Sequence, residues 1–124
     1  MMDLTAIIAA RALAYVERGH WTTYAEARTG VSVFSLPCAW DDPRAQAWCL
    51  MGIVKKVIHD YGGEKGFSPA EHRQLLFTFT ARAEVYVFRE GYRSLRAYND
   101  LGYGRRARVT HLLSTMRRRA RVFV

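Results

Sequence analysis

The chain has 124 residues, which is the size of one domain. Half of the residues are apolar and 24% are charged, which excludes a disordered tail, and no apolar run approaches the roughly 20 residues that span a bilayer. The N-terminus has no basic start, and Asp3 and Arg11 interrupt its apolar run, so we expect no signal peptide and a cytoplasmic protein.

The net charge of +8 is confined to the C-terminal third of the chain. Residues 1–88 hold nine basic and nine acidic side chains, whereas residues 89–124 hold ten arginines and two acids. This asymmetry predicts that the basic third of a single domain, 1–124, meets a polyanion or an acidic protein surface. Arginine suits bidentate contacts with phosphate and stacking on bases. The alternative is a solvated basic face without a partner.

A first helix is predicted over residues 3–18, because apolar side chains recur there at helical spacing and Gly19 follows as a stop signal. Arg11 lies inside the apolar stripe, where it either pairs with an acid or lines a cleft. Between Trp21 and Trp40 the pattern loosens. Residues 30–34 are predicted to form a short extended piece, and residues 35–37 irregular chain.

A second helix is predicted to begin at Asp41-Asp42-Pro43, an Asx cap with proline in the first turn, and to end at Gly62-Gly63. Its apolar side chains cover more than one side, which is typical of a central helix. They are Ala47, Trp48, Leu50, Met51, Ile53, Val54, Val57, Ile58 and Tyr61.

Ser68 and Glu71 form a capping box that predicts a third helix. Residues 77–87 also alternate like a strand, but one helix to Glu90 that stops at Gly91 is favoured, because a capping box has no use before a strand. A last helix is predicted after Gly104. The sequence thus predicts a mainly α, compact single domain of about four helices, with a short extended or irregular piece between the first two.

The last helix carries arginines along both edges of its apolar stripe. The stripe consists of Val109, Leu112, Leu113, Met116 and Ala120. At about 100° per residue, Arg106, Arg117 and Arg121 share one flank, Arg108 and Arg119 share the other, and Arg118 points outward.

Three stretches occur in a characteristic order: Gly19-His20-Trp21, the segment 42–52 that contains Ala45-Gln46-Ala47-Trp48-Cys49-Leu50-Met51-Gly52, and Ser94-Leu95-Arg96-Ala97-Tyr98-Asn99-Asp100. They resemble an uncharacterised family of small helical domains found in phages and their bacterial hosts. Its members have a Gly-x-Trp turn, an Ala-x-x-Trp-Cys-x-x-Gly helix and a Trp-Asn-Asp loop, where Tyr98 replaces the Trp in this chain. The resemblance implies a helical fold and a phage-like origin, and it supplies no catalytic role.

The cysteines give little support to an enzyme or a metal site. Cys38 and Cys49 form no Cys-x-x-Cys pattern, and no His-x3-His spacing accompanies them, so we expect no metal and no cofactor. Cys49 with a histidine and Asp100 is the one arrangement that suggests a nucleophile. A small buried hydrophobe is the favoured interpretation of Cys49.

Tyr98-Asn99-Asp100 before the last helix has two interpretations. The favoured one is structural, with Asx turns or caps. The other is a ligand-binding loop in which Tyr98 or Tyr103 stacks on a base. The candidate residues for binding nucleic acid or a partner are Arg93, Arg96, Tyr98, Tyr103, Arg105, Arg106, Arg117, Arg118 and Arg121.

The leading functional hypothesis is a non-catalytic protein whose basic third docks on nucleic acid or on a nucleoprotein complex. The alternative is a phage-type anti-defence inhibitor or adaptor that binds an acidic surface of a host protein. A small enzyme that uses Cys49 or the Asn99-Asp100 loop is a lesser alternative. A membrane partner is not expected.

Overall fold

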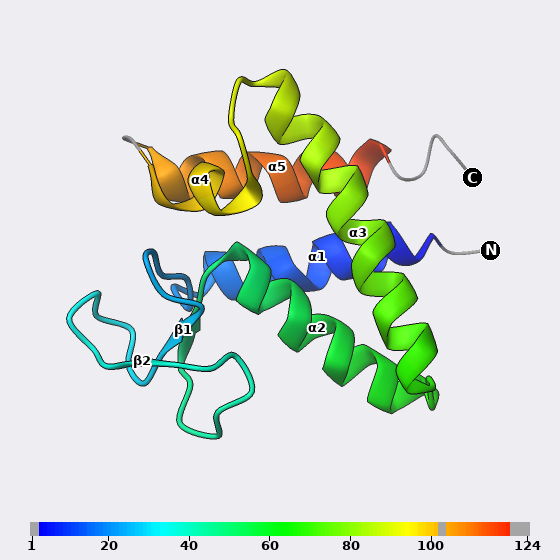
Figure 1. Ribbon diagram of the computed structural model, residues 1–124, viewed down its shortest axis with the longest axis horizontal. Coiled ribbons are helices and arrows are strands. Elements are labelled where there is room, and N and C mark those ends of the chain that lie inside the picture. The colour runs from blue at the N-terminus through cyan, green and yellow to red at the C-terminus, as the bar shows by residue number, and fades with distance from the viewer. Residues whose placement is uncertain (1–2, 102–103, 120–124) are drawn as a thin grey trace.

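The computed structural model describes residues 3–101 and 104–119, and this part of the chain is mostly helical (Figure 1). Its elements are α1 (Leu4–Glu17), β1 (Ala27–Arg28), β2 (Pro37–Cys38), β3 (Ala47–Trp48), α2 (Leu50–Lys65), α3 (Pro69–Arg89), α4 (Leu95–Asp100) and α5 (Arg105–Arg119). The mainly α prediction is confirmed, although the described residues form five helices instead of about four. No described helix has the length and apolar character that a membrane crossing requires.

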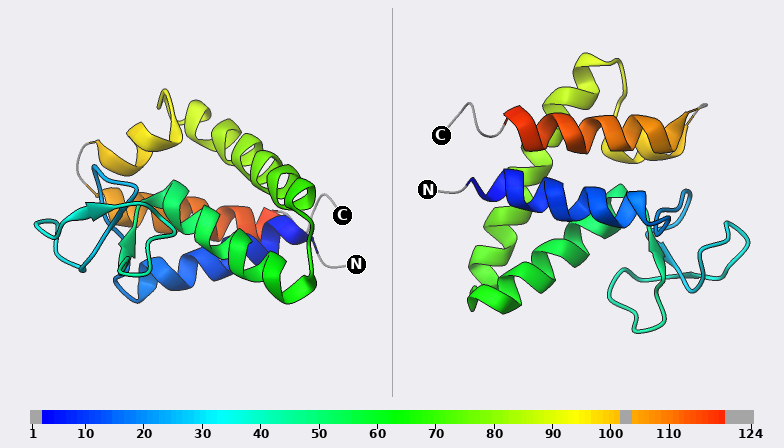
Figure 2. Two further views of the ribbon diagram at one scale, coloured as in Figure 1. Left: turned by 60° about the horizontal axis from the view of Figure 1, so that its bottom comes forward. Right: turned by 180° about the vertical axis from the view of Figure 1, so that it is seen from behind.

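The core is formed by buried side chains of α1, α2, α3 and α5, with further ones from α4. Helices α1 and α5 run side by side in opposite directions, and α3 crosses both near the chain ends (Figures 1 and 2). Helices α1, α2 and α5 direct their apolar stripes inward, as predicted. Their buried side chains include Ile8, Ala12 and Val16 from α1, Ile53, Val54 and Val57 from α2, and Val109, Leu113 and Met116 from α5.

Local signals explain both ends of α1. The side chain of Asp3 accepts a hydrogen bond from the backbone N–H of Thr5, at 2.8 Å, and so caps the first turn. Gly19 has a φ of +83°, a left-handed conformation that glycine adopts without strain. The predicted helix over 3–18 therefore agrees with α1 within a residue at each end.

The predicted start of the second helix is wrong. Asp42 closes a turn instead, because its backbone oxygen accepts from the N–H of Ala45 and its side chain accepts from the N–H of Arg44. The chain then extends into β3, where the backbone N–H of Trp48 donates to the oxygen of His20. Helix α2 begins only at Leu50, with Cys49 as its N-cap. Trp48 is buried as predicted, but it reaches the core from a strand.

The predicted end of this helix is also wrong, because α2 continues through Gly62 and Gly63 and ends before Gly66. Gly62 is needed for packing: a Cβ atom there would lie 2.4 Å from Nε2 of His72 on α3. The stop is at Gly66, which has a φ of +69°.

A small antiparallel sheet in the order β2-β1-β3 replaces the irregular piece between the first two helices. The extended piece predicted at residues 30–34 is wrong, since those residues lie in the loop between β1 and β2. The Arg28 guanidinium holds the base of this loop by donating to the backbone oxygens of Ser35 and Thr23. Phe34, within this loop, is 93% exposed.

Helix α3 is confirmed as one helix with the predicted capping box at Ser68 and Glu71. After it, the predicted loop at Tyr98-Asn99-Asp100 is instead the last turn of α4, which Ser94 caps by accepting from the N–H of Ala97. This short helix lies against α5, and its last three residues, Tyr98, Asn99 and Asp100, are buried.

Candidate nucleic-acid interface

Three arginines at the start of α5 have partners within the fold. The Nε–H of Arg108 donates to the backbone oxygen of Tyr98 at 2.9 Å, and the guanidinium also donates to the oxygen of Leu101. The same guanidinium lies 4.6 Å from the ring centroid of Tyr92. Arg108 therefore fastens α4 to α5.

Arg106 and Arg105, both predicted binding residues, also contact backbone oxygens. Nη2 of Arg106 donates to the oxygens of Val16 and Glu17, at 3.0 and 3.2 Å, and so caps the C-terminus of α1. Nη1 of Arg105 donates to the oxygen of Asp100 at 2.9 Å. These side chains stay partly or fully at the surface, but they have a role in the fold.

Tyr98 does not form a stacking surface, and its prediction as a binding residue is corrected. Its side chain is 0% exposed, its hydroxyl donates to the backbone oxygen of Arg108 at 2.8 Å, and its ring packs edge-on against Tyr92. Burial, followed by the negative charge of Glu90, raises the pKa of this phenol. Its position on the inner face of α4 places the ring in the core.

Asn99 and Asp100 are buried and join three segments. Oδ1 of Asn99 accepts from the indole Nε1 of Trp21 and from the backbone N–H of Leu50. Oδ1 of Asp100 accepts from the backbone N–H of Tyr24 at 3.0 Å. These contacts support the structural interpretation of Asn99 and Asp100.

Of the remaining predicted residues, four lie at the surface and two lie outside the described residues. Arg93, Arg96, Arg117 and Arg118 are exposed. Nε of Arg96 lies 3.8 Å from Oδ2 of Asp100. Tyr103 and Arg121 lie outside the described residues. The flank of Arg106, Arg117 and Arg121 is therefore not a uniform binding edge, because Arg106 caps α1.

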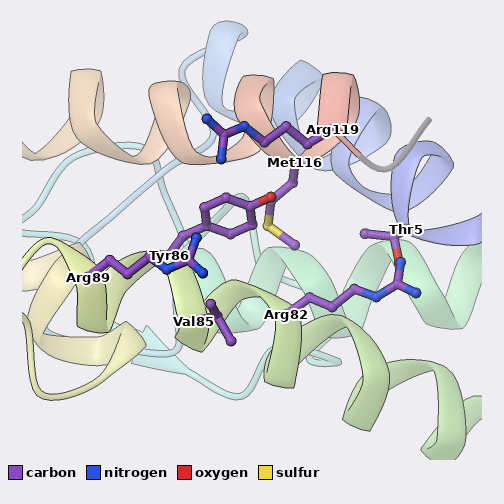
Figure 3. A pocket seen from close by; sticks show the side chains of 7 residues that line it. All are labelled: Thr5, Arg82, Val85, Tyr86, Arg89, Met116 and Arg119. Atoms are coloured by element: carbon purple, nitrogen blue, oxygen red, sulfur yellow. The ribbon is translucent and has the colours of Figure 1, made fainter. Parts of the chain in front are cut away.

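A cleft of about 320 Å³ lies where α3 crosses α1 and α5, and we name it the α3–α5 cleft (Figure 3). Its lining consists of Thr5, Arg82, Val85, Tyr86, Arg89, Met116 and Arg119. The apolar part comes from Val85, Met116 and the ring of Tyr86. The three arginines come from two helices, so the crossing angle of α3 over α5 brings them together.

The charge in this cleft is only partly balanced. Nη1 of Arg82 donates to the hydroxyl of Thr5 at 2.7 Å and lies 3.5 Å from Oδ2 of Asp3. Arg119 lies 5.9 Å from the ring centroid of Tyr86. Within the described residues, neither Arg89 nor Arg119 forms a salt bridge. The cleft therefore carries an excess of positive charge.

Arg82, Arg89 and Arg119 are not among the binding residues that the sequence predicts. Arg82 lies in the neutral part of the chain, and Arg119 lies on the flank of α5 opposite Arg106 and Arg117. One signal was present: Arg82 and Arg89 are seven residues apart, which is two helical turns, so both lie on one face of α3 beside Val85 and Tyr86.

The enzyme hypothesis rests on Cys49 and on the Asn99-Asp100 pair. All three residues line a second cavity of about 340 Å³. Burial raises the pKa of the Cys49 thiol, so the neutral form prevails, and its sulfur accepts from the N–H of Gly52 as a helix cap. None of the described residues that line this cavity is a histidine. The described residues also form no group of three or more His, Cys, Asp or Glu side chains that could hold a metal ion.

No family model, no curated protein and no solved structure matches the chain. The function must therefore be inferred from the chemistry of the site itself.

Proposed function

We propose that the protein is a non-catalytic binding protein that docks on nucleic acid, or on a nucleoprotein complex, through the arginines of the α3–α5 cleft. The observation that carries the proposal is the convergence of Arg82, Arg89 and Arg119 on one cavity. Converging like charges repel one another unless an anion lies between them. Guanidinium groups match the geometry of phosphate oxygens, which favours a phosphate backbone as that anion.

A neighbouring arginine supports a surface longer than the cleft. Arg118 immediately precedes Arg119 on α5 and is exposed, whereas Arg117 lies on the opposite flank of the helix. A nucleic-acid strand carries regularly spaced phosphates, so it gains more from such an extended surface than a single small anion does. The cleft would take one phosphate, and the end of α5 its neighbours.

The proposal is tested by binding of a labelled oligonucleotide at several salt concentrations, measured by fluorescence anisotropy. The double variant Arg89→Ala/Arg119→Ala removes the two cleft arginines that have no acidic partner among the described residues. We expect its affinity to fall about ten-fold or more. We also expect the slope of log K against log salt to become shallower, by the amount that about two phosphate contacts contribute.

The matched control is Arg18→Ala/Arg73→Ala, which removes the same charge from two exposed positions outside the cleft. We expect this control to change affinity less than about two-fold. Equal losses in both double variants would mean diffuse attraction without a site. Wild-type affinity in the cleft variant would contradict the proposal.

A second candidate function is an inhibitor or adaptor of phage type that binds a host protein. The observation that favours it is the β1–β2 loop, where Phe34 is 93% and Leu36 70% exposed. Exposed apolar side chains on a loop with a held base are common at protein interfaces. If Phe34→Ala abolishes capture of a stoichiometric host protein and the cleft variant does not, this second function replaces the first.

A further inference from the structure

Tyr24 combines an unfavourable backbone conformation with an exposed aromatic ring. Its φ is +58°, and it is the only non-glycine residue with positive φ in the described part of the chain. Asparagine or glycine adopts this left-handed conformation at lower cost, whereas a bulky residue is an outlier there. The ring is nevertheless 59% exposed, so core packing does not account for the choice of tyrosine.

Neighbouring contacts hold Tyr24 in this conformation. Its backbone N–H donates to Oδ1 of Asp100, and that carboxylate is buried and also accepts from Nδ2 of Asn99 at 2.7 Å. The two residues before it, Thr22 and Thr23, are buried. The fold therefore maintains the strain at Tyr24, which is a pattern found at binding sites.

A basic side chain lies beside the ring. The Arg105 guanidinium lies 5.8 Å from the ring centroid. Its Nη1 donates to the backbone oxygen of Asp100, which holds the guanidinium in place. A guanidinium held there suits contact with the phosphate that adjoins a stacked base.

We propose that Tyr24 is a stacking platform for an unpaired nucleobase, with Arg105 beside it to contact an adjoining phosphate. This inference rests on the proposed function and adds that the nucleic acid is single-stranded at this point. A base in a duplex is already stacked on its neighbours and cannot cover the ring without being displaced.

The test compares a short thymidine oligonucleotide with an abasic oligonucleotide of the same length and charge, using wild type, Tyr24→Gly and Tyr24→Trp. We expect Tyr24→Gly to weaken binding of the thymidine strand about ten-fold, with little change for the abasic strand. Tyr24→Trp keeps an aromatic face and should retain binding. Because glycine relieves the positive φ, Tyr24→Gly should not lower the urea midpoint, which separates loss of stacking from loss of folding.

Phe77→Ala is the matched control, since it removes another exposed aromatic ring, on α3, and should leave both affinities unchanged. Unchanged thymidine binding in Tyr24→Gly, with weakened binding in the Arg89/Arg119 variant, would overturn the platform and leave the proposed function intact. Equal losses for the thymidine and abasic strands would also overturn it. If wild type binds neither strand, both proposals fail.

Discussion

The indole Nε1–H of Trp21 donates to Oδ1 of Asn99 at 2.6 Å, across 78 residues of sequence. The same oxygen accepts from the backbone N–H of Leu50 at 3.0 Å, and Nδ2 of Asn99 donates to the backbone oxygen of Thr22 at 3.1 Å. One buried amide thus connects the segment after α1, the start of α2 and the end of α4. It also positions Asp100, which in turn holds Tyr24.

Asn99→Ala should destabilise the fold by about 3 kcal/mol, because it leaves several buried donors and acceptors without partners. Asn99→Asp should also destabilise, since it loses the donor to Thr22 and places a second carboxylate beside Asp100. Urea unfolding followed by circular dichroism measures both. Gln74→Ala removes an exposed amide from α3 and should change little. Wild-type stability in Asn99→Ala would contradict the central role of this amide.

The sequence predicted the elements whose signals are local. The stop at Gly19, the capping box at Ser68 and the stop at Gly91 agree with α1 and α3 because each depends on residues within a few positions. The predicted start of α2 is wrong for the opposite reason, because it depends on residues that are distant in sequence. Asp42 was a genuine capping signal, but pairing of β3 with β1 and with His20 determined that it closes a turn.

The sequence predicts an arginine excess and a set of candidate residues, but it does not predict which arginines converge on the α3–α5 cleft. Which arginines remain available depends on backbone oxygens that lie far away in sequence, such as those of Val16 and Glu17, which Arg106 contacts. Helical periodicity can place Arg106 on a flank of α5, but it cannot identify the helix end that lies opposite. The crossing that brings Arg82 and Arg89 to Arg119 is likewise a tertiary feature.

Arg106→Ala should lower the free energy of unfolding by about 1 kcal/mol, because the last carbonyl groups of α1 lose a charged donor. Arg118→Ala removes the same charge from an exposed position of α5 and should have no measurable effect. Urea denaturation of the two variants at one salt concentration gives the comparison. Equal stabilities would mean that water replaces the guanidinium at no cost.

Cys49→Ser should maintain or raise stability, whereas Cys49→Ala should lie about 1 kcal/mol below the serine variant. The reason is the position of Cys49 at the N-cap of α2, where its sulfur accepts from the N–H of Gly52 at a distance of 3.4 Å. A serine hydroxyl is the preferred acceptor at such a position. Thermal melts of both variants decide this, and a serine variant less stable than alanine would show that burial outweighs capping.

Tyr98→Phe should change how stability depends on alkaline pH. Burial raises the pKa of Tyr98 in the folded state, so between the unfolded pKa of about 10 and the folded value the folded protein holds a proton that the unfolded chain has lost. This contribution is complete below pH 10 and is lost as the pH rises above it. Near pH 7 the variant should be about 1 kcal/mol less stable than wild type, because the hydrogen bond to the oxygen of Arg108 is absent. Above pH 10 wild type loses stability faster, so the two curves should converge.

Urea unfolding between about pH 7 and 11 measures the difference, with Tyr24→Phe as the control at an exposed tyrosine. A constant gap between wild type and Tyr98→Phe over this range would mean that the phenol ionises equally in the folded and unfolded chains.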